Sequence, residues 1–138
     1  MAAEKSKKPP GSSRRHFLSK TIPLLFAAES IFLIYMAFQP GYAIPAFHFP
    51  FLRGGDGEHF LAYLAYGFLA YGAFSLKIRD RKALLLSLVW AGFFAGVTEG
   101  IQAFVPTRFA DPADWVVDVI GAGAGVCISR RGVRSISS

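Results

Sequence analysis

The sequence predicts an all-α protein, a four-helix transmembrane bundle with both termini in the cytoplasm. The 138 residues are 53% hydrophobic and only 17% charged, and the mean hydropathy is +0.39. A soluble domain of this size would have too little polar surface at that composition. The apolar residues fall into four separate runs, and the basic residues flank these runs rather than interrupt them.

The formal net charge of +6 arises mainly from three clusters of Lys and Arg, in residues 1–20, 77–82 and 130–138. The two other connections hold only Arg53 and Arg108. Basic residues beside apolar runs mark the cytoplasmic side of a membrane, so we expect no nucleic-acid partner. The same rule puts loops 39–58 and 105–112 outside, in a multi-pass membrane protein.

Composition also sets the expected domain boundaries. These are a disordered basic cytoplasmic tail at 1–20, a transmembrane domain at 21–129 and a second basic cytoplasmic tail at 130–138. Disorder is expected for the first tail because Lys, Ser, Pro and Gly dominate it. The single cysteine, Cys127, cannot form an internal disulfide.

One stretch of the first tail permits a second interpretation. The segment 13–20 contains Arg14 and Arg15 and resembles a twin-arginine export signal. Three further spans follow it, so a positive flank of the first span is the simpler interpretation. Both remain open at this point.

The apolar runs predict four helical spans, at 22–38, 59–76, 83–104 and 112–129. At a rise of ~1.5 Å per residue, each run covers most or all of a ~30 Å hydrocarbon core. The connection 39–57 contains three prolines and many aromatic residues. It is therefore expected to be an interfacial loop whose rings lie at headgroup level.

The fourth span carries a capping pattern and a stripe of small residues. Asp111 suits the N-cap, and Asp114 occupies the capping-box position three residues later. Asp114, Asp118, Gly121 and Gly125 are spaced by four, three and four residues, so they share one helix face. We expect Gly121 and Gly125 to serve helix packing, because glycine allows another helix to approach closely.

The predicted topology brings most of the polar residues of the spans and outer loops to one depth near the outer surface. These residues are Asp56, His59, Glu99, Gln102, Arg108, Asp111, Asp114 and Asp118. An acidic residue at mid-span costs on the order of 3 kcal/mol. Glu29, Glu99 and Asp118 should therefore face one another, water or a cation, with Arg108 and His59 as counter-charges. Whether Glu29 is a protonated structural acid or a functional one is left open.

Several of these residues together resemble a known family, the VanZ-like membrane proteins. The resemblance rests on His-Phe-Leu-Ala-Tyr at 59–63, on Glu99-Gly-Ile-Gln102 leading to Arg108, and on Asp114 followed by Gly121. It covers about residues 50–128. It implies a link to the cell envelope and a place in the bacterial cytoplasmic (inner) membrane, since the name-giving member is associated with low-level resistance to the glycopeptide teicoplanin.

The chain departs from the family pattern at three positions. Gly55 stands where the family commonly has Asp, and Asp56 where it has Lys. Asp118 stands where the family often carries Asn. Each change adds negative charge or removes a charged group, so family roles at these positions do not transfer.

Our leading hypothesis is a polar pocket that opens to the outer leaflet and binds a polar or anionic, lipid-linked envelope component. The candidate catalytic residues are His59, Glu99 and Asp114, and the candidate binding residues are Arg108, Gln102, Asp118, Asp56 and Tyr63. The expected partners are membrane lipids, a lipid-linked intermediate and a second copy of the chain. No cofactor and no metal are expected, because the ligand spacing fits no recognised pattern.

Two alternatives belong to other functional classes. The first is a membrane hydrolase acting on a lipid phosphate or a lipid-linked glycan, in which His59 and nearby carboxylates perform acid–base or metal-assisted hydrolysis. Its weakness is that no nucleophile stands out in the sequence. The second is a small transporter or non-catalytic partner subunit, in which Glu29 and the acidic residues relay protons.

Overall fold

The computed structural model describes residues 11–41 and 56–137 and confirms the all-α class. Within these ranges the chain forms four helices and no strand: α1 (Gly11–Ala37), α2 (Asp56–Ser75), α3 (Asp80–Gln102) and α4 (Pro112–Ser137). The first part of the expected tail, residues 1–10, and most of the proline-rich loop expected at 39–57 lie outside the described residues.

Two helices extend beyond the apolar runs that predicted them. α1 begins at Gly11, so residues 11–20 are helical where a disordered tail was expected. α4 continues to Ser137, through most of the basic segment that was expected to be a tail. Extending an existing helix is far easier than nucleating one, and Ser, Arg and Lys are acceptable helix formers. A helix therefore has no reason to end where its apolar side chains end.

Three of the described helices are long and apolar enough to cross a membrane: α1 from His16, α3, and α4 as far as Ser135. α2 does not meet that criterion, because a polar first turn and several tyrosines and glycines lower its hydropathy. It is instead the central helix, packed against each of the other three. A helix shielded in this way from lipid need not be apolar on every face.

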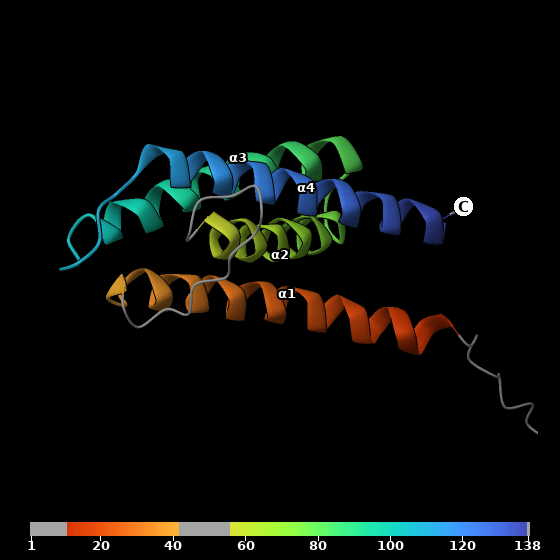
Figure 1. Cartoon of the computed structure of the whole chain (residues 1–138). Helices are drawn as coiled ribbons and strands as arrows, with labels where there is room; N and C mark the ends of the chain where they lie inside the picture. Colours follow the sequence, from red (N-terminus) through yellow and green to blue (C-terminus); the bar gives the residue numbers. More distant parts are fainter. Residues whose placement is uncertain (1–10, 42–55, 138) are drawn as a thin grey trace, which may run out of the picture.

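The four helices form one bundle in which alternate helices run in opposite directions (Figure 1). α1 begins and α4 ends at the same end of the bundle, whereas α2 and α4 both begin at the opposite end. The pair α2 and α4 is therefore parallel, and it makes the most extensive helix contact in the structure.

Glycines set the close approach of α2 and α4. A Cβ at Gly121 would lie 2.5 Å from the carbonyl oxygen of Phe60, and a Cβ at Gly125 would overlap the carbonyl oxygen of Leu64. A Cβ at Gly67 would likewise overlap the backbone of Ala122. Because backbone cannot move aside as a side chain does, only glycine permits this spacing.

The outer surface is apolar and the interior is built from small residues. Several large side chains on α1 and α3 are more than half exposed: Leu24, Ile31, Leu85, Val89 and Phe93. The buried core contains many alanines around Tyr63 and Tyr66. Such a distribution is typical of a bundle surrounded by lipid, in which small residues mediate helix contacts.

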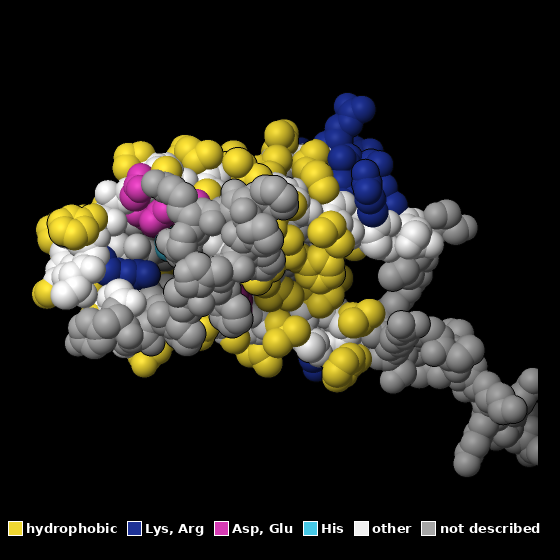
Figure 2. Space-filling view, in the orientation of Figure 1, with side chains coloured by type: hydrophobic (Ala, Val, Ile, Leu, Met, Phe, Trp, Pro, Cys, Tyr) yellow, Lys and Arg dark blue, Asp and Glu magenta, His cyan; other side chains and the backbone are white. Residues whose placement is uncertain are grey.

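Charge separates along the bundle. Figure 2 shows hydrophobic side chains over its middle, with Lys and Arg side chains gathered at the end where α4 finishes. Acidic side chains lie at the opposite end, beside a smaller basic patch.

At the basic end of the bundle, an ion-pair cluster forms around Asp80, the first residue of α3. Arg130 donates from Nε to Oδ1 (2.8 Å) and from Nη2 to Oδ2 (2.6 Å) of Asp80. Arg134 donates to Oδ2 (2.8 Å), and the Tyr71 hydroxyl donates to Oδ1 (2.7 Å). This carboxylate thus joins α3 to the ends of α2 and α4.

Candidate functional site

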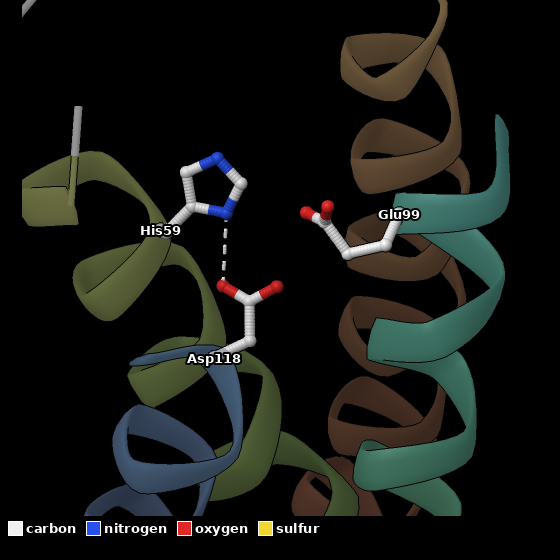
Figure 3. A group of neighbouring side chains, drawn as sticks. All are labelled: His59, Glu99 and Asp118. Atoms are coloured by element: carbon white, nitrogen blue, oxygen red, sulfur yellow. Dashed lines mark hydrogen bonds and ion pairs between the residues drawn. The ribbon is translucent and has the colours of Figure 1, made fainter. Parts of the chain in front are cut away.

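Three side chains from three helices meet at the acid-bearing end of the bundle. They are His59 in the first turn of α2, Glu99 in the last turn of α3 and Asp118 in the second turn of α4. One ligand atom from each lies within 4.8 Å of the others. Figure 3 shows the imidazole and both carboxylates directed toward a common point. We call these residues the polar cluster.

The contact between α2 and α4 sets the geometry of the polar cluster. His59 Nδ1 and Asp118 Oδ1 are 3.0 Å apart. His59 directly precedes Phe60, whose carbonyl oxygen packs against Gly121, three residues beyond Asp118. The same glycine that allows the helices to touch therefore brings the imidazole and the carboxylate within hydrogen-bonding distance.

The carboxylates of the polar cluster are buried and incompletely paired. Glu99 is 7% exposed and Asp118 is 0% exposed, and the side chain of His59 is 15% exposed. Within the described part of the chain, Glu99 Oε1 and Asp118 Oδ2 have no hydrogen-bond partner. A buried polar atom without a partner costs on the order of 1–3 kcal/mol. Such an arrangement is typical of a site that meets a ligand.

Beneath the polar cluster lies a second polar contact, between Tyr63 of α2 and Thr98 of α3. Their hydroxyl oxygens are 2.5 Å apart, and both residues are buried. Thr98 Oγ1 lies 3.0 Å from the carbonyl oxygen of Ala95, to which it donates its single proton. Tyr63 is then the donor to Thr98. Tyr63 thus acts as a support one turn below His59.

A further layer joins Tyr66 to Trp90, whose indole Nε1 donates to the Tyr66 hydroxyl (2.9 Å). Thr98 and Trp90 were not among the residues selected from the sequence. Threonine and tryptophan are ordinary within apolar runs, so no sequence signal marked them. Thr98 was detectable only as the residue next to Glu99.

The start of α4 is tied to the end of α3. Asp111 Oδ1 accepts a hydrogen bond from the N–H of Ala113 (2.8 Å), which is the N-cap interaction expected at this position. The N–H of Asp111 itself donates to Glu99 Oε2 (3.3 Å). Glu99 therefore uses one carboxylate oxygen to hold the turn and directs the other into the polar cluster.

The remaining candidate residues surround the polar cluster without joining it. Gln102 and Asp56 are buried, at the last turn of α3 and the first turn of α2. Asp114 is half-buried one turn before Asp118, and its charge acts on all three members of the polar cluster.

Arg108 is half-buried in the connection between α3 and α4, and its side chain lies against Gly41. Within the described residues it makes no ion pair with Glu99 or Asp118. Among the described residues, the basic group that pairs with a carboxylate of the polar cluster is the His59 imidazole.

The arrangement supports two kinds of chemistry. A histidine and two carboxylates aimed at one point provide ligands for a cation, and a histidine held by an aspartate provides an oriented acid or base. No family model, characterised protein or solved structure matches this chain.

Proposed function

We propose that the protein is a VanZ-like, multi-pass membrane protein whose polar cluster binds the polar or anionic headgroup of a lipid-linked envelope component. The observation that carries this proposal is the convergence of His59, Glu99 and Asp118 at one end of an otherwise apolar bundle. Ionisable residues inside membrane-spanning helices are costly, so sites that retain them commonly bind or move a polar ligand.

The position of the polar cluster favours a headgroup over a freely diffusing solute. Each of its residues lies within two turns of a helix end, which is close to headgroup depth if all four helices cross the bilayer. α2 would cross as the shielded central helix. A lipid could then present its headgroup to the polar cluster while its chains remain against the exposed apolar face.

The charge asymmetry favours the outer leaflet. The basic residues of the α2–α3 turn and of the end of α4 lie opposite the polar cluster. The positive-inside rule assigns that basic end to the cytoplasm, and thereby both termini. The polar cluster would then face the extracytoplasmic side of a bacterial inner membrane.

The test compares envelope lipids by mass spectrometry in a deletion strain complemented with the wild-type protein, Glu99→Ala or Gly100→Ala. A Cβ at Gly100 would meet nothing within 4 Å, so Gly100→Ala is the matched neighbouring control. We expect the same lipid intermediate to accumulate with Glu99→Ala as in the deletion strain, but not with Gly100→Ala. An identical lipid profile for wild type and an inserted Glu99→Ala protein would refute the proposal.

A second candidate function, hydrolysis of a lipid phosphate or lipid-linked glycan, is favoured by the bond between His59 and Asp118. The carboxylate holds Nδ1, and Nε2 lies on the side of the ring away from Asp118 (Figure 3). An imidazole oriented in this way can take a proton from water.

Hydrolysis predicts that the purified protein releases phosphate or sugar from lipid-linked substrates and that His59→Ala abolishes the release. Binding without release, lost in the same variant, would assign the site to recognition alone.

A further inference from the structure

We propose that the polar cluster is a binding site for one divalent transition-metal cation, with Zn²⁺ or Mn²⁺ as the best-suited ions. The ligand spacing in the sequence fits no recognised metal-binding pattern, so this proposal depends on the structure. The proposal extends the proposed function, because a cation would supply the positive charge that an anionic headgroup meets. It rests on the proposed function only for what the bound metal would do. Metal binding itself can be measured without any lipid.

The separation of the ligand atoms suits a shared ion. His59 Nδ1 and Asp118 Oδ1 are already 3.0 Å apart, and the largest separation within the set is 4.8 Å at most. Ligands of one tetrahedral Zn²⁺ at ~2.1 Å lie roughly 3.4 Å from one another. The largest separation between ligand atoms in the polar cluster thus exceeds the separation in such a zinc site by roughly 1.4 Å at most. A bound ion would therefore draw the three side chains together by up to that amount.

The unpartnered oxygens supply an independent indication of a ligand. Glu99 Oε1 and Asp118 Oδ2 are buried without a hydrogen-bond partner among the described residues. Figure 3 shows the Glu99 carboxylate pointing from α3 toward the His59–Asp118 pair. Two carboxylates and one neutral imidazole sum to two negative charges, which one dication neutralises. In a low-dielectric bundle that neutralisation removes most of the cost of burying both acids.

The chemical types of the three ligand atoms indicate which ions the site would prefer. Imidazole nitrogen suits Zn²⁺ and other first-row metals, whereas Mg²⁺ and Ca²⁺ prefer oxygen ligands alone. Three protein ligands also leave a coordination position open, as in zinc sites that bind water or substrate oxygen. The N–H of Asp111 on Glu99 Oε2 provides the outer contact that commonly orients a metal-binding carboxylate.

The test is metal titration of the purified full-length chain in detergent, after chelator treatment and without a histidine tag. A Cys127→Ser background removes the exposed thiol as a competing ligand. We expect one Zn²⁺ or Mn²⁺ per chain by calorimetry and elemental analysis. Glu99→Gln and Asp118→Asn, each nearly isosteric, should weaken binding at least ~10-fold, as losing even an outer contact of a metal ligand can do.

Asp80→Asn is the control, because it neutralises a carboxylate that pairs with Arg130 and Arg134 at the opposite end of the bundle, away from the polar cluster. It should bind the metal as the wild type does. Helix content by circular dichroism shows that each variant is folded. Absence of stoichiometric binding to the wild type overturns the proposal, as does unchanged binding by folded Glu99→Gln and Asp118→Asn.

The two proposals fail separately. A chain that binds one metal through the polar cluster, yet shows no lipid phenotype for Glu99→Ala, keeps the metal site and loses the headgroup function. A chain that binds no metal, yet retains a lipid phenotype sensitive to Glu99, keeps the headgroup function and loses the metal site.

Discussion

His59 Nδ1 lies 3.0 Å from Asp118 Oδ1, although 59 positions separate the two residues in the chain. The pair joins the first turn of α2 to the second turn of α4, and the contact of Gly121 with Phe60 holds the two helices at that spacing. Packing and chemistry are therefore coupled in this protein. A change in the glycine contact also changes the site.

The first prediction separates the charge of Asp118 from its hydrogen bond. Asp118→Asn retains an oxygen acceptor for His59 but removes a buried negative charge. Because burying an ionised group is costly, we expect a melting temperature equal to or higher than that of the wild type, together with loss of function. Thermal unfolding in detergent and complementation of the deletion strain measure the two effects.

Asp118→Ala serves as the comparison for this prediction, because it leaves the His59 imidazole partly buried without its partner. It should lower the free energy of unfolding by about 1–3 kcal/mol. If Asp118→Asn complemented fully, the carboxylate charge would have no role in the site.

The second prediction concerns the two glycines Gly125 and Gly123, which differ only in what faces them. A Cβ at Gly125 would overlap the carbonyl oxygen of Leu64, whereas a Cβ at Gly123 would meet nothing within 4 Å. Gly125→Ala should therefore separate α2 from α4 and destabilise the protein by about 1–3 kcal/mol. Gly123→Ala should leave thermal stability unchanged or slightly raised.

Equal melting temperatures for these two alanine variants would show that α2 and α4 lie farther apart than they do in the structure. Complementation should follow stability, because the same contact sets the distance between His59 and Asp118.

Glu99 and Asp118 could be identified from the sequence because an acidic residue within an apolar run is energetically costly and commonly has a function. The sequence did not identify which residue pairs with which. Arg108 was expected as a counter-charge, and the structure places it beside Gly41 instead. Pairing between helices depends on their relative register, which a backbone contact at Gly121 sets and hydropathy does not report.

The cluster around Asp80 illustrates the same limit. Asp80 lay in a turn predicted to be basic, and Arg130 was interpreted only as a topology marker. Their contact spans 50 positions and follows from the lengths of α3 and α4 together. Helix length was itself underestimated, because apolar runs indicate where a bilayer lies rather than where a helix ends.

The third prediction tests this cluster. Asp80→Asn removes the charge that Arg130 and Arg134 share, so it should lower the melting temperature at low ionic strength. The groups are partly solvent-exposed, and salt screens such pairs, so the difference from wild type should shrink as salt is raised. A salt series of thermal unfolding curves measures this. A salt-independent difference would assign the effect to the hydrogen bond from Tyr71 instead.

The fourth prediction tests the proposed orientation by cysteine labelling in a Cys127→Ser background. Phe109 is 90% exposed in the connection between α3 and α4, and Arg131 is exposed near the end of α4. Phe109→Cys should react with a membrane-impermeant maleimide in intact spheroplasts, whereas Arg131→Cys should react only after permeabilisation. The reverse pattern would place the polar cluster at the cytoplasmic face. The ligand would then have to be a headgroup of the inner leaflet, and outer-leaflet binding would be excluded even if Glu99→Ala kept its lipid phenotype.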